Sequence, residues 1–313
     1  MYKPFLHILF CLLTSALRAQ QNLVPNPSFE EVSQCPDHRE DFTRLEHWTK
    51  VGGTPDIHHS CMNHDVYSEI PLNDFGWQWP RTGESYVGFH LNPPDVREYF
   101  QCKLMEQLEV GESYVVQFFV SHADSSTTAC DNVGVLLSAI SVSSTNNEVL
   151  PYTPQVTSPM GQPITDDVGW VRIMDTLIAD GSEQYLTIGV FSNDESTTFL
   201  TVPGGWDADS HYYVDDVSLV KLTRSIEVPN VFTPNGDGLN DRLQIGTTGY
   251  LNGKMSIYNR WGVQVFSQEG TSFEWDGRIN GADGNAGIYY LVVSMFDEMD
   301  NGIIEKGFVH LLR

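Results

Sequence analysis

Apolar and polar residues alternate with a period of two along much of the chain after residue 84. This alternation is typical of β-strands, because successive side chains of a strand point to opposite faces of the sheet. In the segment Tyr114 to His122, Val116 and Phe118 share one face while Val115 and Phe119 share the other. The same pattern predicts strands at Ser85 to Phe89, Arg97 to Leu104, Val133 to Ile140, Trp170 to Leu177, Tyr185 to Phe191 and Tyr212 to Leu222.

Residues 20–222 are therefore expected to form one all-β domain. No segment carries an apolar stripe of helical period over three turns, and strands of this number and spacing are typical of a two-sheet jelly-roll β-sandwich. The polar region from Glu31 to Arg81 contains tryptophans but almost no alternation, so it is expected to consist of loops.

A second, smaller β-domain is predicted at residues 229–313, after a short polar linker at 223–228. There Met255 to Tyr258 and Val263 to Phe266 flank Asn259-Arg-Trp-Gly262, which has the composition of a hairpin turn. Further strands are expected at Ile288 to Ser294 and Gly307 to Leu312.

Residues 1–19 have the features of a secretory signal peptide. Lys3 provides a basic start, an apolar run extends from Phe5 to Leu13, and Ala16 and Ala19 supply small residues near the expected cleavage site. The apolar run is well short of the roughly 20 residues that span a bilayer. We therefore expect export, with no membrane insertion after the signal is removed.

The composition favours a folded, acidic, exported protein. The 313 residues are 41% hydrophobic and 12% aromatic, enough to fill two cores, and the formal net charge is −24. Such an acidic excess argues against nucleic acid or anionic lipid as a partner and favours divalent cations.

Four cysteines follow the signal peptide, an even number that predicts disulfides in an oxidising compartment. Three pairings are possible. We favour Cys35 with Cys61 and Cys102 with Cys130, because each closes a loop within one region of the chain.

The stretch Pro229-Asn-Val-Phe-Thr-Pro-Asn-Gly-Asp-Gly-Leu-Asn-Asp241 must turn sharply, because Pro234 fixes φ and Gly236 and Gly238 accept positive φ. Its Asp237, Asn240 and Asp241 are compatible with either a calcium ion or an Asx-turn that satisfies its own backbone.

This stretch and the later motifs "IYNRWG", "WDG" and "AGIYY", followed by a last strand ending at Arg313, resemble the type B sorting domain of the type IX secretion system. The family is also called the gliding-motility-associated C-terminal domain, and the resemblance covers Val228 to Arg313. It implies an immunoglobulin-like β-sandwich that an outer-membrane translocon recognises, and passage of the protein to the cell surface or the medium.

The leading region resembles jelly-roll carbohydrate-binding modules and their galactose-binding-like relatives. The resemblance is carried by "NLVPNPSFEE" at its start and "YYVDDVSLV" at its end. It implies a structural calcium that bridges the first and last strands, with Glu30 and Asp216 as ligands and Asp215 as a further candidate. The alternative is that the two aspartates only pair with nearby polar groups.

Glycan recognition needs aromatic rings that stack on the apolar face of a sugar. Five aromatics in or beside loops are candidates for such a platform: Trp77, Trp79, Tyr99, Trp206 and Tyr212. The alternative for each is packing in the core. Trp77 and Trp79 are favoured, because the Trp-Gln-Trp spacing points both rings to one side of an extended chain.

Other constellations are weaker. His58, His59, Cys61 and His64 have the spacing of a zinc site, but export makes Cys61 a better disulfide partner. The acids Asp56, Asp74, Glu84 and Glu98 could include a glycosidase pair, although any acidic surface offers such pairs by chance.

We therefore expect no catalytic activity, and a secreted protein that binds glycans in adhesion or polymer capture. One alternative is a structural or protein-interaction module of the cell envelope, and another is a polysaccharide hydrolase.

Overall fold

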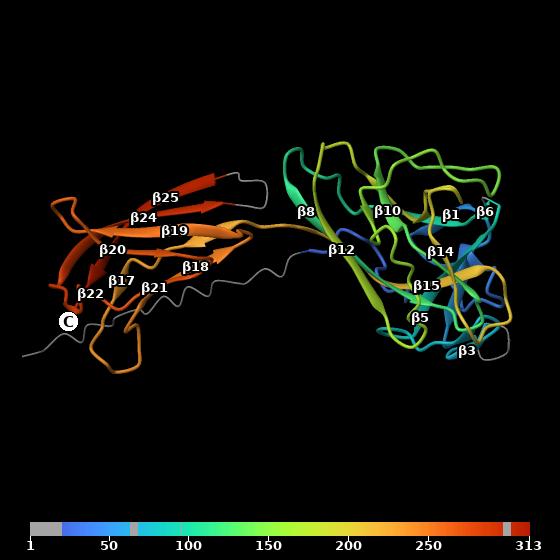
Figure 1. Ribbon diagram of the computed structural model, residues 1–313, viewed down its shortest axis with the longest axis horizontal. Coiled ribbons are helices and arrows are strands. Elements are labelled where there is room, and N and C mark those ends of the chain that lie inside the picture. Colours follow the sequence, from blue (N-terminus) through green and yellow to red (C-terminus); the bar gives the residue numbers. More distant parts are fainter. Residues whose placement is uncertain (1–20, 63–67, 95, 297–301) are drawn as a thin grey trace, which may run out of the picture. The chain divides into compact units, whose positions relative to one another are not determined.

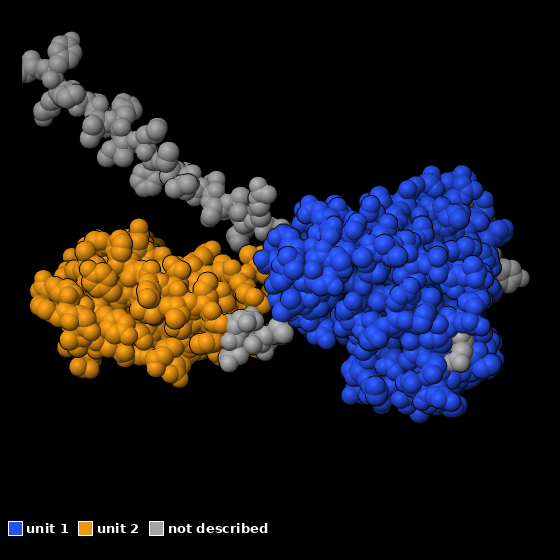
Figure 2. Space-filling model, turned by 90° about the horizontal axis from the view of Figure 1, so that it is seen from above, with its two compact units in different colours: residues 1–221 blue, residues 222–313 orange. Residues whose placement is uncertain are grey.

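The structure, a computed structural model, describes residues 21–62, 68–94, 96–296 and 302–313. The chain divides into two compact units, residues 1–221 and 222–313 (Figure 2). Each unit has a hydrophobic core of its own. The division lies between Lys221 and Leu222, one residue before the end predicted for the first domain.

The first unit is built around two antiparallel sheets (Figure 1). One has the strand order β1 (Trp48–Gly52), β7 (Tyr99–Lys103), β13 (Tyr185–Val190), β10 (Val133–Ser138) and β11 (Val156–Thr157). The other has the order β12 (Val171–Ile178), β8 (Ser113–His122), β15 (Ser210–Lys221), β5 (Ser85–Asn92) and β2 (Asp56–His59), and β6 (Val96–Arg97) pairs with β5. Smaller elements are η1 (Phe42–Arg44), the pair β3 (Leu72–Asn73) and β4 (Gly76–Trp77), and the pair β9 (Thr128–Cys130) and β14 (Phe199–Thr201).

The core of this unit lies between the two sheets. Alternate residues of the central strands point inward and are fully buried, among them Phe118 and Val214 from the second sheet and Phe100 and Ile188 from the first. Removing these side chains from water is the main contribution to the stability of the sandwich. The predicted all-β fold is confirmed.

Two parts of the sequence-based prediction are wrong. The region from Glu31 to Arg81 is not only loops, because β1 and β2 lie in it and each pairs with a strand of a main sheet. All four residues of β2 are buried although three of them are polar (Asp56, His58 and His59), so the strand has no alternation of apolar and polar residues to detect. The predicted linker at 223–228 also contains a strand, β16 (Ser225–Glu227), which pairs with β18 (Leu243–Thr248).

The second unit is a smaller sandwich, as predicted. One sheet has the order β16, β18 and β21 (Phe273–Trp275), and the other has β17 (Val231–Phe232), β25 (Gly302–Leu311), β24 (Gly287–Phe296), β19 (Asn252–Tyr258) and β20 (Gln264–Glu269). A short pair joins β22 (Arg278–Ile279) and β23 (Ala282–Asp283). The core contains Phe232 and Trp275, with ring centroids 5.4 Å apart.

The motif between β17 and β18 closes on itself. The Asp241 carboxylate accepts hydrogen bonds from the backbone N–H groups of Gly236 and Gly238, at 2.6 and 2.8 Å. Asp237 accepts one from Leu239. The bond from Leu239 to Asp237 is that of an Asx-turn, and the Asp241 bonds close the loop on its own backbone.

The disulfide between Cys35 and Cys61 is confirmed, with the two Cα atoms 6.0 Å apart. The predicted bridge between Cys102 and Cys130 is wrong, because both thiols are free and buried. Cys102 lies on β7 and Cys130 on β9, strands that belong to different sheets, and both side chains pack in the core. Spacing along the chain could not reveal that separation.

Within residues 21–62, 68–94, 96–296 and 302–313, no helix is long and apolar enough to cross a membrane.

Candidate functional site

Trp77, the last residue of β4, and Trp79, in the loop that follows it, are both exposed. Their side chains are 53% and 58% exposed, and the rings lie edge to face with centroids 6.3 Å apart. Gln78 between them is buried and donates a hydrogen bond to the Ser121 hydroxyl. The Trp170 indole N–H donates to the Trp79 carbonyl at 3.2 Å. The alternation predicted for this tripeptide thus holds, and both rings are left at the surface.

Backbone hydrogen bonds connect Trp206, the third exposed tryptophan of this unit, to the segment that carries Trp77 and Trp79. Its N–H donates to the Ser125 carbonyl at 2.7 Å, while the Ser125 N–H donates to the Phe75 carbonyl at 3.1 Å. The Trp77 N–H donates to the Asp124 carboxylate at 3.0 Å. Residues 72–79, 124–126 and 204–207 therefore form one connected cluster, which we call the tryptophan loops.

A shallow groove of about 390 Å³ adjoins the tryptophan loops. It shares Asp124 and Ser126 with them and mixes polar and apolar side chains. Its lining residues are His122, Asp124, Ser126, Thr165, Asp167, Leu200, Thr201, Val202 and Pro203. The cluster thus offers flat aromatic rings beside carboxylate and hydroxyl groups, the combination that suits a sugar.

Tyr99 and Tyr212 do not belong to this surface, so that part of the predicted platform is wrong. Both side chains are fully buried. The Tyr99 hydroxyl donates to the Val190 carbonyl at 2.7 Å, and the Tyr212 hydroxyl lies 3.1 Å from the carbonyl of Ile164. The Tyr212 ring points between the sheets and packs near Phe89. The Tyr99 ring points to the other face of its sheet, where it is buried with Leu150 and Phe191.

The predicted calcium ligands meet at one loop, residues 81–85. The Glu30 carboxylate accepts hydrogen bonds from the N–H groups of Glu84 and Ser85. Asp215 accepts from the N–H groups of Arg81 and Thr82, at 2.8 and 3.2 Å. Residues near the two ends of the domain thus lie close together, as the resemblance implied.

The same carboxylates are already occupied by hydrogen-bond donors. Asp216 accepts from the Ser28 and Thr82 hydroxyls and forms an ion pair with the Arg81 guanidinium. Burial, followed by the charge of Asp216, raises the pKa of Asp215 to about 8. A calcium cage needs six to eight oxygen ligands, whereas here N–H groups and a cation take these oxygens. The arrangement does not fit a calcium cage, and calcium binding at Glu30, Asp215 and Asp216 stays a prediction.

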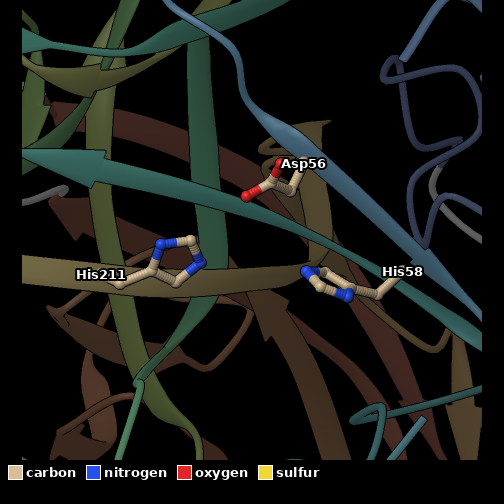
Figure 3. Close-up of side chains that lie close together, drawn as sticks. All are labelled: Asp56, His58 and His211. Atoms are coloured by element: carbon tan, nitrogen blue, oxygen red, sulfur yellow. The ribbon is translucent and has the colours of Figure 1, made fainter. Parts of the chain in front are cut away.

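A second polar cluster lies on the outer face of the β12-β8-β15-β5-β2 sheet. Asp56 and His58 come from β2 and His211 from β15, with β5 between these strands (Figure 3). One ligand-type atom of each residue lies within 4.8 Å of the others. All three residues are buried, although this face points away from the core of the sandwich.

Residues 70–79 cover this cluster. The Phe75 ring stacks on the His211 ring, with centroids 3.7 Å apart and planes 10° apart. Asn73 bridges the hydroxyls of Tyr86 and Tyr213, at 3.0 and 2.9 Å. The tryptophan loops are thus the outer surface of the segment that buries the cluster.

Burial dominates the electrostatics of the cluster. It raises the pKa of Asp56 to about 8, with a further contribution from Glu98 and an opposing one from Arg39, whose guanidinium lies 3.5 Å away. Burial also lowers the pKa of His211 well below its usual value. Burial thus disfavours the charged form of both Asp56 and His211.

The sequence did not predict this grouping. His58 was assigned to a zinc set with His59, Cys61 and His64, but Cys61 is in a disulfide and His64 lies outside the described residues. His211 was not singled out. Its only signal was its place two residues before Tyr213, on the outward face of β15.

The candidate glycosidase acids all have partners. Asp74 pairs with Arg39 at 2.7 Å, and Glu84 accepts a hydrogen bond from Ser60 at 2.8 Å. Glu98 is buried and pairs with His90 at 3.0 Å. Because Asp56 is buried as well, these four carboxylates give the hydrolase alternative no support.

Comparisons with known proteins were made for both units. No curated protein sequence matches the chain. The K3 cleaved adhesin domain of Lys-gingipain from Porphyromonas gingivalis w83 is similar in structure, with a TM-score of 0.34 and 12% identity over 63% of this chain and 98% of that one. The CBM22-1 xylan-binding domain of Paenibacillus barcinonensis Xyn10C gives a TM-score of 0.36 and 14% identity over 66% of this chain and 97% of that one.

These structural likenesses are distant, and they concern the fold alone. The second unit is matched more specifically. Residues 226–311 match the family model described as the CHU_C Type IX secretion signal domain, which confirms the resemblance recognised in the sequence. The chain therefore carries a type IX secretion signal domain, is handled by that secretion machinery, and is secreted to the cell surface or the extracellular space.

Proposed function

We propose that this secreted protein binds glycans through the tryptophan loops, in adhesion or in the capture of polymeric carbohydrate, and that it does not catalyse a reaction. The observation that carries the proposal is the grouping of Trp77, Trp79 and Trp206 as exposed rings on hydrogen-bonded loops. Large aromatic side chains are rarely exposed together without a ligand or partner to cover them.

The chemistry of a sugar matches this surface. The C–H face of a pyranose stacks on an aromatic ring, while its hydroxyls need hydrogen-bond acceptors and donors nearby. Asp124 and Asp167 in the adjoining groove provide acceptors, and Thr201 provides a hydroxyl. The edge-to-face arrangement of Trp77 and Trp79 would present two ring surfaces to successive parts of one ligand.

The test is binding of the purified two-domain protein to a glycan array, with wild type compared with the double variant Trp77→Ala, Trp79→Ala. Loss of two aromatic anchors costs roughly 2 kcal/mol or more, so the affinity for the bound glycan should fall about 30-fold or further. Trp261→Ala is the matched control, because Trp261 is a 72% exposed tryptophan in the second unit.

The alternatives give different outcomes. Silence across a broad array, together with co-purifying envelope proteins, would replace the proposal with a protein-interaction module. Release of reducing sugar from a polysaccharide would establish a hydrolase. Equal affinity of wild type and the double variant would move the glycan site away from Trp77 and Trp79.

A further inference from the structure

His211 is a buried histidine that the proposed function does not use. Its side chain is fully buried, and within the described part of the chain neither of its ring nitrogens has a hydrogen-bond partner. Buried polar atoms are almost always hydrogen-bonded, because leaving one unsatisfied carries a desolvation penalty. Neutral imidazole nitrogen is a common ligand of metal ions, and a metal ion would satisfy it in such a place.

Gly88 of β5 leaves open the space that these nitrogens face. A Cβ atom at this position would lie 2.7 Å from Nε2 of His211 and 3.4 Å from Nε2 of His58. Gly88 is also the register partner of Asp56 on one side and of Tyr213 on the other. The two Nε2 atoms and the Asp56 carboxylate therefore converge above a residue that has no side chain (Figure 3).

We propose that Asp56, His58 and His211 bind one divalent transition-metal ion of the zinc class. Two imidazoles and one carboxylate form a ligand set that suits Zn²⁺ and its neighbours, whereas calcium and magnesium prefer oxygen alone. The three ligand-type atoms lie within 4.8 Å of one another, a spacing that one ion can bridge. Three protein ligands leave a fourth position for a water molecule.

The surroundings orient the ligands. Nδ1 of His58 lies 3.4 Å from the Ser68 carbonyl, a contact that favours Nδ1 as the protonated nitrogen and leaves the Nε2 lone pair for the metal. Arg39, 3.5 Å from Asp56, and His90, with its ring centroid 6.4 Å from that of His211, are the cationic neighbours. The His90 ring nitrogen is engaged by Glu98, so the Asp56 carboxylate would be shared between Arg39 and the metal.

The ion would act as a structural link. It would join β2, the edge strand, to β15 across β5, beneath the Phe75 ring that stacks on His211. Metal binding to the folded state alone stabilises that state by mass action. The ion would thus fix the segment that carries the tryptophan loops, without contacting a glycan.

The experiment uses the purified two-domain protein after removal of metals by a chelator. Titration with Co²⁺ should give one bound ion per chain with visible absorption typical of a four-coordinate nitrogen and oxygen site, and Zn²⁺ should displace it. Zn²⁺ should also raise the melting temperature of the first unit. Absence of stoichiometric binding in wild type would overturn the proposal.

The variant His211→Phe removes one ligand and keeps a ring to stack on Phe75. It should weaken Co²⁺ binding by more than the roughly 10–100-fold that loss of an outer-shell partner costs. His90→Gln, on the same face of the sheet, is the matched control and should keep the Co²⁺ spectrum. Unchanged affinity in His211→Phe would refute the assignment.

A measurement on wild type alone covers the case in which His211→Phe does not fold. In the Co²⁺ form, paramagnetically shifted ring N–H signals should arise from two histidines, and His58 and His211 are the two expected. Shifted signals from no histidine, or from His122 or His310, would contradict the proposed site.

Discussion

The two units differ in whether the outer face of their principal sheet is covered by other residues or exposed. In the first unit, the outward side chains Tyr86, His211 and Tyr213 are fully buried, because residues 70–79 lie over them. In the second unit, Tyr290 on β24 and its register partner Phe308 on β25 are 51% and 52% exposed. Similar aromatic strands thus have a covered face in one unit and a bare face in the other.

Outward aromatic side chains on a strand therefore do not by themselves determine whether their face of the sheet is buried or exposed. A covered face is part of the interior of its unit, and the polar groups on it can have partners within the protein. A bare apolar face marks a surface for another molecule. Ile288 and Ile304 extend the exposed face around Tyr290 and Phe308. Since the second unit is a secretion signal domain, we expect this face to contact the secretion machinery.

The largest expected effect comes from removing the unit with the bare face. A chain that ends at Leu222 keeps the whole first unit and its core, so it should fold and remain in the periplasm. Cell fractionation and surface proteolysis would measure its location. Arrival of this truncated chain at the cell surface would break the assignment of the second unit as the export signal.

A smaller effect is expected from removing the disulfide of the first unit, the unit with the covered face. The Cys35–Cys61 disulfide closes a loop of 26 residues, and Cys61 lies just after β2. Replacing both cysteines by serine should therefore lower the free energy of unfolding of the first unit by about 3 kcal/mol. Thermal or denaturant unfolding would measure it.

Reductant provides the control for that prediction. Cys102 and Cys130 are free thiols, so a reducing agent should destabilise wild type and leave the double serine variant unchanged. A further loss of stability in the reduced variant would show that a second disulfide exists in the protein.

The smallest effect on stability is expected on the bare face itself. Tyr290→Ser and Phe308→Ser remove exposed rings and should change the unfolding free energy of the second unit by about 0.5 kcal/mol each. Export of the pair variant should nevertheless fall, because the contact surface is lost. Pulse-chase export assays together with thermal unfolding would separate the two effects.

Val110→Ser is the control for the bare face, because Val110 is a 75% exposed apolar residue of the first unit. It should alter neither export nor stability. Normal export of the Tyr290→Ser, Phe308→Ser variant would show that the machinery reads another surface of the second unit.

Much of the fold could be predicted from local pattern. The strands around Val116 and Tyr185 were predicted because apolar residues recur at every second position, although most residues on both of their faces are buried. β2 was missed, because both of its faces are covered and its four residues show no period. Local pattern also could not tell that Tyr99 and Tyr212 are buried while Trp77 is exposed, because burial depends on which segments cover each face.

The sequence by itself determined the C-terminal secretion signal, the all-β class, the division near residue 222 and one disulfide. These follow from short-range patterns and from ordered motifs in a continuous stretch of chain. Only the tertiary structure decided which aromatics are exposed, which cysteines stay apart, and that Asp56, His58 and His211 meet above Gly88. The physical reason is that strand pairing joins residues more than 100 positions apart, and the covering segment then decides which face water reaches.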